Sequence, residues 1–204
     1  KNNGREDHAK KDRRIVLEHD FPIGELGKIS PYGVYNLNNN TGFVNLGTSH
    51  DTSEFAVESI SRWWDTVGKH TFPNSKRIYI TCDSGGSNGC RVKMWKYQLQ
   101  EFANHTGLEI EISHFPRGTS KWNKVEHRLF CYITQNWKGK PLVDIQTAVD
   151  LIGSTKTTTG LEVICVRDDN EYRLAKKVSD EDFESIAINK IKPFELWNYR
   201  IIPN

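Results

Sequence analysis

The order of strand-like and helix-like segments constrains the fold of this chain more than any other feature of the sequence. Three strand-like segments follow one another through short links, at Arg14–Phe21, Tyr32–Leu37 and Phe43–Thr48. The link between the second and the third reads Asn-Asn-Asn-Thr-Gly, and Asn and Gly tolerate the positive φ of a hairpin turn. The three strands are therefore expected to form an antiparallel meander.

Helix and strand patterns alternate after this meander. A capping sequence and an apolar stripe predict a helix that ends at Gly68, and a strand follows at Arg77–Cys82. A second helix is expected from about Arg91 to Gly107, and the strictly alternating Leu108–Ser113 is a fifth strand. This order predicts an α/β fold, with a mixed five-stranded sheet whose first three strands are antiparallel and which is flanked by helices.

The C-terminal part is expected to form a small α+β extension. Its pattern predicts a helix at about Val143–Ile152, a strand at Leu161–Val166 with a partner near Tyr172, a helix starting at Ser179 and a last strand at Trp197–Ile202. The start of the chain, residues 1–14, is basic and lacks periodicity, which is typical of a linker or arm. The sequence thus predicts an arm at 1–14, a core domain at 15–141 and an extension at 142–204 that packs on the core.

The charge of the chain is small in total but unevenly spread. The net charge is +2, yet residues 1–14 carry +3, residues 114–141 carry +5 and the remainder carries −6. Two basic segments on an otherwise acidic chain favour a nucleic-acid partner, although ordinary surface charge is the alternative. Apolar residues make up 36% of the chain, which is enough for a packed core and argues against wholesale disorder.

The cysteines and the hydropathy exclude several classes of protein. None of the four cysteines is in a CxxC pair, so neither a zinc ribbon nor a thioredoxin-type site is indicated. Free thiols suit a reducing cytoplasm, the expected location, with association to the nucleoid if the protein is bacterial. The sequence contains no signal peptide and no apolar run long enough to span a membrane.

The stretch from His114 to Pro141 combines a loop, a helix and a concentration of charge. Hydroxyls at Thr119 or Ser120 can cap a helix, and apolar residues recur at helical spacing from Trp122 onward. Glu126 is the single acid here, surrounded in sequence by six cations. The pattern indicates a site for a polyanion, and a solvated amphipathic helix explains it equally well.

Three acids stand where the expected fold would form a site. Asp20 ends the first strand, Asp83 follows the fourth, and Glu126 lies early in the helix after the fifth. Loops at strand ends gather at one edge of an open α/β sheet. Carboxylate oxygens suit Mg²⁺ or Mn²⁺, and two such ions about 3.5–4 Å apart can promote displacement at phosphorus. Taken singly, Asp20 could be a surface acid and Asp83 a helix cap; Asp51, a further candidate, is well explained as a cap.

Several strings of the sequence carry a specific resemblance. They are HDFP, PYGVYNL, DTSEFAVESISRWW, DSGGSNG, HFPRGTSKWNKVEHRLF, QNWKGKPL and LIGSTKTTTGL. With these strings the chain resembles the DDE transposases of the retroviral-integrase superfamily, and among them the ISAzo-thirteen-type insertion-sequence transposases. The resemblance runs from about Lys1 to Asn204, and the family's N-terminal DNA-recognition helices would lie before Lys1.

The resemblance implies a fold, an activity and a metal site. It implies an RNase H-like catalytic core that cleaves and joins DNA at insertion-sequence ends, acting as a homo-oligomer assembled on DNA. It also implies two Mg²⁺ (or Mn²⁺) ions, with Asp20 bridging both, Asp83 on one and Glu126 on the other. Two alternatives remain open: an inactive or repurposed copy that only binds DNA, and an RNase H-like nuclease without strand transfer.

The sequence departs from the family pattern at two positions. The family often has Asp where Asn36 stands and Pro where Arg117 stands. If position 36 held the first catalytic acid, this copy would be inactive. The order of strands favours Asp20, because it ends the first strand and is followed by Phe.

Candidate DNA contacts gather around Glu126. Cations that would meet phosphates position DNA without reading its sequence. Trp122 could stack on a base or sugar, and a core position is the alternative. For His114, the alternative to a DNA contact is a structural role. The candidates are His114, Arg117, Lys121, Trp122, Asn123, Lys124 and Arg128.

Overall fold

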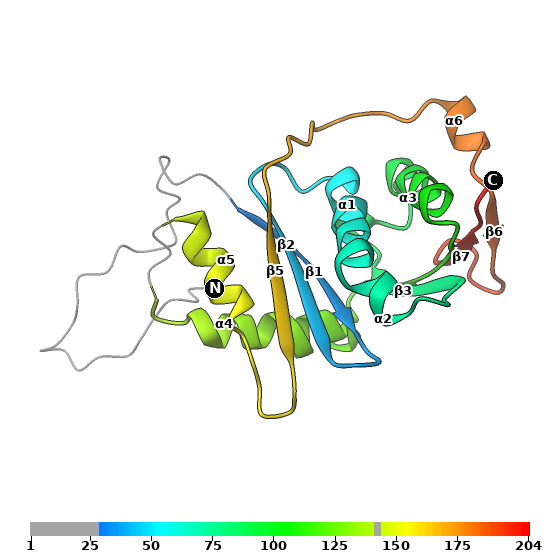
Figure 1. Ribbon diagram of the computed structural model, residues 1–204. Helices are drawn as coiled ribbons and strands as arrows, with labels where there is room; N and C mark the ends of the chain where they lie inside the picture. Colours follow the sequence, from blue (N-terminus) through cyan, green and yellow to red (C-terminus); the bar gives the residue numbers. More distant parts are fainter. Residues whose placement is uncertain (1–28, 141–143) are drawn as a thin grey trace, which may run out of the picture. The chain divides into compact units, whose positions relative to one another are not determined.

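The computed structural model of the chain describes residues 29–140 and 144–204. It is an α/β protein with mixed sheets and flanking helices, as the sequence predicts (Figure 1). The described chain falls into two compact units, each built from two stretches. The first unit consists of the described residues within 1–49 and 124–170, and the second of His50–Asn123 and Glu171–Asn204. In these described parts, no helix has the length and apolar character needed to cross a membrane.

A three-stranded sheet forms the centre of the first unit. Strands β1 (Ser30–Asn36) and β2 (Thr41–Gly47) pair antiparallel, so the predicted hairpin is confirmed. Asn40 takes a positive φ of 55° in the turn, which is the conformation that its Asn-rich sequence favours. β5 (Glu162–Asp168) pairs with β2 in parallel. The residues around Tyr172 form no strand, so the prediction of a partner strand there is wrong. Parallel pairing requires a long connection, and helix α5 directly precedes β5.

Two helical segments cover this sheet and complete the first core. A π-helical turn, η4 (Glu126–Phe130), continues into α4 (Cys131–Trp137), and α5 (Ile145–Gly153) begins at the cap Asp144. Both segments pack on the sheet beside β1 and β5 (Figure 1). Their apolar residues meet those of the strands in one cluster that comprises Val44, Leu46, Leu129, Ile133, Ala148, Ile152, Leu161 and Val163.

A four-stranded sheet forms the centre of the second unit, in the order β3-β4-β7-β6. β3 (Arg77–Asp83) and β4 (Glu109–Phe115) are parallel and are joined through α3 (Lys93–Thr106). β7 (Asn198–Ile201) adds antiparallel to β4, and β6 (Ile188–Lys190) adds antiparallel to β7. The C-terminal residues therefore belong to the same sheet as Asp83.

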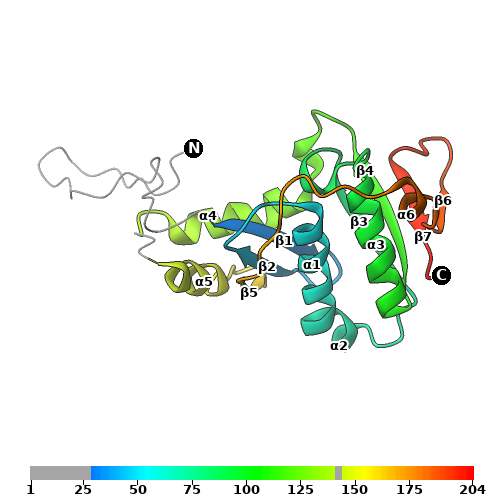
Figure 2. The same cartoon turned by 90° about the horizontal axis from the view of Figure 1, so that it is seen from above.

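Helices α1 and α3 lie side by side in the second unit (Figures 1 and 2). α1 (Ser53–Trp63) begins within the predicted capping sequence, but its cap is Thr52 rather than Asp51, because the Thr52 hydroxyl accepts a hydrogen bond from the Phe55 amide. It continues through the π-helical turn η1 (Trp64–Gly68) into α2 (Lys69–Thr71). A short helix, α6 (Asp180–Glu184), begins at the predicted Ser179 cap.

The sheets differ from the single five-stranded sheet that the sequence predicts. The described residues form one sheet of three strands and another of four. The predicted first strand, Arg14–Phe21, lies outside these residues. Within the described chain, β1 and β3 are both edge strands, so each has one side to which no described strand is paired. β6 was not predicted, because three residues are too few to show alternation.

Candidate functional site

Asp83 is the last residue of β3, where the parallel ladder with β4 ends opposite Phe115. Its side chain is half-buried, and among the described residues no hydrogen bond or ion pair engages its carboxylate. The chain then turns through Ser84–Gly89, which includes the short 3₁₀ turn η2 (Gly86–Asn88). The Ser53 hydroxyl, at the start of α1, donates a hydrogen bond to the Ser87 carbonyl and so ties this loop to a helix. The loop that follows Asp83 is thus tied to the start of α1.

His114 lies on the neighbouring strand β4, opposite Cys82, the residue before Asp83. It is buried, and its Nδ1 is 2.9 Å from the Asp83 carbonyl oxygen. Its Nε2 is 2.9 Å from the hydroxyl of Tyr199 on β7, and that hydroxyl is 3.0 Å from Nε1 of Trp95 on α3. Trp95 and Tyr199 are fully buried. A chain of hydrogen bonds therefore runs from α3 through β7 and β4 to the end of β3.

The chemistry of these groups determines which atom donates and which accepts in each of these three hydrogen bonds. A carbonyl oxygen only accepts, so Nδ1 of His114 carries the proton that lies between it and Asp83. In the neutral imidazole, Nε2 then accepts from the Tyr199 hydroxyl. The indole N–H of Trp95 only donates, so it donates to the Tyr199 oxygen. With these donors and acceptors, the indole of Trp95, the hydroxyl of Tyr199 and both ring nitrogens of His114 all have hydrogen-bond partners.

Burial keeps the side chains of His114 and its neighbour Cys82 in their neutral forms. It lowers the pKa of His114 below its usual value and outweighs the hydrogen bond to the Asp83 carbonyl, which raises it. Burial also raises the pKa of the neighbouring Cys82 thiol to about 12. The Sγ atom of Cys82 lies 3.3 Å from Nδ1 of His114, where it can act only as a weak acceptor. Near neutral pH, the His114 and Cys82 side chains are therefore uncharged.

Glu126 opens the π-helical turn η4 and is exposed. Residues 124–125 are helical and lead into this turn, which replaces the regular α-helix expected from Trp122 onward. Its carboxylate makes no hydrogen bond or ion pair with any residue in the described part of the chain. π-Helical turns inside helices occur frequently at functional sites.

Glycines in the first sheet let the Glu126 segment approach closely. A Cβ at Gly33 would lie 2.7 Å from Cζ of Phe130, and a Cβ at Gly42 would overlap Cδ1 of Leu129. Leu129 is itself fully buried on the sheet. Because these contacts pin the segment three and four residues beyond Glu126, the backbone that carries this acid has a defined position in its unit.

The predicted basic contacts are exposed. Arg117, Lys121, Lys124 and Arg128 all face solvent, and none of them pairs with an acid in the described residues. Trp122, which ends the 3₁₀ turn η3 (Ser120–Trp122), exposes 51% of its surface. Exposed cations suit contacts with a phosphate backbone, and an exposed aromatic ring suits stacking on a base.

Two of the predicted DNA contacts are buried. His114 is buried and uses both ring nitrogens inside the protein, and Asn123 exposes only 7% of its surface. These environments suit structural roles. The sequence suggests a DNA contact at His114 because this residue stands near Glu126, and nothing local to His114 signals its partner Tyr199, 85 residues away.

Asp20 lies outside the described residues, so its place relative to the other acids stays a prediction. In the described part, no three His, Cys, Asp or Glu side chains form a group that could hold a metal ion. Asn36, the alternative position for the first acid, ends β1 and is 8% exposed. Its Oδ1 accepts from the Asn38 amide at 3.0 Å, while its Nδ2 has no hydrogen-bond partner among the described residues.

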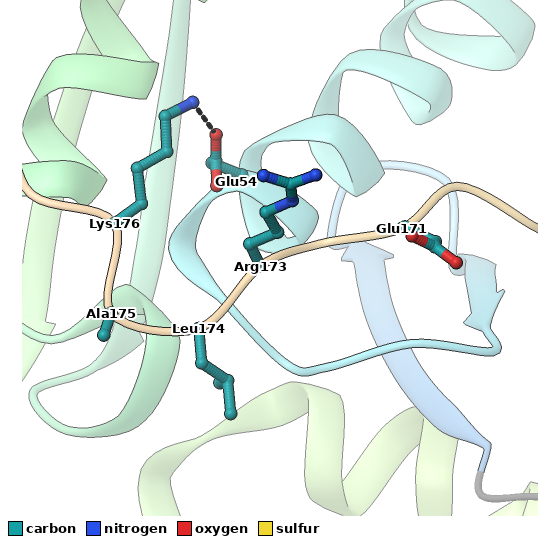
Figure 3. A pocket seen from close by; sticks show the side chains of 6 residues that line it. All are labelled: Glu54, Glu171, Arg173, Leu174, Ala175 and Lys176. Carbon is teal, nitrogen blue, oxygen red and sulfur yellow. Dashed lines mark hydrogen bonds and ion pairs between the residues drawn. The ribbon is translucent and has the colours of Figure 1, made fainter.

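A hollow in the second unit contains none of the predicted site residues. It has a volume of about 530 Å³ and lies between the start of α1 and the segment that follows β5 (Figure 3). Its acidic and basic side chains balance, and Lys176 forms an ion pair of 2.6 Å with Glu54. It is lined by Glu54, Glu171, Arg173, Leu174, Ala175 and Lys176.

Comparison with known proteins agrees with the resemblance seen in the sequence. The family model described as "Rhodopirellula transposase DDE domain" matches residues 1–203. No curated protein and no solved structure matches the chain. Because the family model extends over almost the whole sequence, the chain belongs to the DDE transposase family described by the Rhodopirellula transposase domain.

Proposed function

We propose that this chain is the catalytic domain of a DNA transposase, which cleaves phosphodiester bonds at insertion-sequence ends and joins the freed 3′-hydroxyl to target DNA. The observation that carries the proposal is Asp83, whose carboxylate ends a strand and has no partner among the described residues, in a chain that matches the DDE family over residues 1–203. The catalytic acids are Asp20, Asp83 and Glu126. The family membership supports the transposase function, and the acids are the finer step that the proposal adds.

The donor chemistry of the two described acids fits Mg²⁺ or Mn²⁺. Both are carboxylates, which are hard oxygen ligands, and neither is neutralised by a cation in the described residues. A carboxylate that is left without a protein partner at a strand end is available to a metal ion. We propose that Asp20, Asp83 and Glu126 would hold two such ions. When bound, the ions would activate the attacking oxygen and stabilise the leaving oxygen on phosphorus.

An RNase H-like arrangement is part of the proposal. It needs the strand predicted at Arg14–Phe21, and β1 and β3 each have one edge to which no described strand is paired. A strand that runs parallel to β3 brings its last residues to the same edge of the sheet as Asp83. Asp20 lies at that end of the predicted strand.

The basic residues around Glu126 would hold the DNA backbone. We expect Lys121→Ala, Lys124→Ala and Arg128→Ala each to weaken DNA binding for every sequence tested and to lower the slope of log K against log[salt] by about one, because each loses one phosphate contact. Fluorescence anisotropy with duplexes of different sequence, over a range of salt concentrations, measures both effects.

A matched control for these variants is Lys69→Ala. Lys69 is exposed like the others, but it already pairs with Asp65 at 2.9 Å. We expect its removal to leave the slope unchanged. Unchanged slopes in all three variants near Glu126 would show that those residues are ordinary solvated charges.

A substrate comparison tests the proposed function directly. We expect the chain, in Mn²⁺, to join a duplex with a free 3′-hydroxyl end to plasmid DNA and to leave the RNA strand of an RNA–DNA hybrid intact. Cleavage of the hybrid without joining would favour a ribonuclease H-like nuclease. Duplex binding that yields neither product would identify a copy that only binds DNA. Gel analysis of end-labelled strands distinguishes these outcomes.

A further inference from the structure

We propose that His114 is a positioning residue for Asp83, and that it holds the backbone of this acid through its Nδ1–H so that the carboxylate is fixed for metal binding. The inference rests on the proposed function, because it gives Asp83 a metal to hold. It adds a residue that would itself touch neither metal nor DNA.

Asp83 needs a supporting side chain because the hydrogen bonding between β3 and β4 ends at this residue. Asp83 is the last residue of β3, and its neighbour across the ladder, Phe115, is the last residue of β4. β3 is also an edge strand within the described chain, so its other side has no described strand to hold it. The carbonyl of Asp83 is instead bonded by the His114 side chain at 2.9 Å. That hydrogen bond takes over where strand pairing ends.

The bond can act as a support because the imidazole cannot turn away. Its far nitrogen, Nε2, is held by the Tyr199 hydroxyl at 2.9 Å, and that hydroxyl is held by Trp95 at 3.0 Å. Trp95 and Tyr199 are both fully buried. A ring flip would place a C–H against the Asp83 carbonyl and another against the Tyr199 oxygen, which would leave buried polar groups unsatisfied.

The arrangement makes the C-terminal strand part of the acid's support. Tyr199 lies on β7 opposite Ile112 of β4, and the Trp197 carbonyl accepts from the His114 amide at 2.9 Å. The His114 backbone and side chain are thus both tied to residues 197–199. The function of β7 would then extend beyond completing a sheet.

Two substitutions of nearly equal size separate positioning from simple structural support. In Asn the amide nitrogen is bonded to Cγ, as Nδ1 is in His, so His114→Asn keeps a donor near the Asp83 carbonyl. In Gln the amide lies one bond farther out, near the place of Nε2, so His114→Gln loses that donor. Both variants lose the ring, and both should have a lower Tm.

The readout is the affinity of the 204-residue chain for Mn²⁺, measured by isothermal titration calorimetry without DNA. We expect His114→Gln to bind Mn²⁺ roughly 10- to 100-fold more weakly, the usual loss when a group that orients a metal ligand is removed. His114→Asn should bind as the wild type does. Ile110→Val, a fully buried change on the same strand, lowers Tm without touching Asp83 and should also bind normally.

Asp83→Asn distinguishes failure of this inference from failure of the proposed function. If Asp83→Asn abolishes Mn²⁺ binding while His114→Gln binds normally, Asp83 is a ligand and His114 does not position it. Equal losses in His114→Gln and His114→Asn also overturn the inference, because they would follow from lost packing. If the wild-type chain does not bind Mn²⁺, or Asp83→Asn binds it unchanged, the proposed metal site fails and the role of His114 fails with it.

Discussion

Replacing Asp83 by Asn is expected to abolish DNA cleavage and leave the fold intact. An amide supplies no negative charge, and a hard cation requires it. We expect the cleavage rate to fall by at least about 10²–10³-fold, the scale seen when one group that stabilises developing charge is removed. The fold should persist because Asn has the same shape and the Asp83 carboxylate makes no hydrogen bond or ion pair among the described residues. Cleavage of a labelled duplex in Mn²⁺, with circular dichroism and Tm, measures both properties.

The control for this variant is another acid of the second unit. Asp180 lies in the first turn of α6 and pairs with Lys93 at 2.6 Å, on a side chain that is 86% exposed. Asp180→Asn removes the same charge, so we expect cleavage to continue at the wild-type rate. Full cleavage by Asp83→Asn, with unchanged metal dependence, would remove Asp83 from the catalytic site.

Local signals in the sequence predict much of the fold. The Asn-rich link predicts the β1–β2 hairpin, and the capping sequences at residues 51–54 and 179–182 predict where α1 and α6 begin, to within a residue. These features depend on neighbours within a few residues, which is the range over which a pattern can be interpreted. The acid at the end of β3 is predicted in the same way, because a strand followed by Asp-Ser-Gly-Gly has an evident end.

Features that depend on distant residues were not predictable. The parallel pairing of β5 with β2 joins segments about 120 residues apart, and the strand pattern of Glu162–Asp168 carries no information about its partner. The support of His114 by Tyr199 and Trp95 is of the same kind. The π-helical turn at Glu126 also escapes prediction, because apolar spacing of three and four residues is compatible with either helix type over so short a stretch.

The second large effect concerns the first catalytic acid, for which Asp20 and position 36 are the two candidates. Asn36 ends β1 at the hairpin turn, where its Oδ1 accepts from the Asn38 amide at 3.0 Å. This contact gives its side chain a structural role that Asp could also fill. The strand predicted at Arg14–Phe21 runs antiparallel to β1 in the expected meander. The C-terminal ends of these two strands, which carry Asp20 and Asn36, would then point to opposite edges of the sheet.

We therefore expect Asp20→Asn to lose cleavage as completely as Asp83→Asn, and Asn36→Asp to retain it. Asn36→Asp should also have a lower Tm, because it places a carboxylate in a site that is only 8% exposed. The decisive variant is Asp20→Asn combined with Asn36→Asp, which should remain inactive because a carboxylate at the far edge cannot replace the lost ligand. Cleavage restored in this double variant, or raised above wild type in Asn36→Asp alone, would instead make position 36 the site of the first acid and the natural Asn36 the reason for low activity.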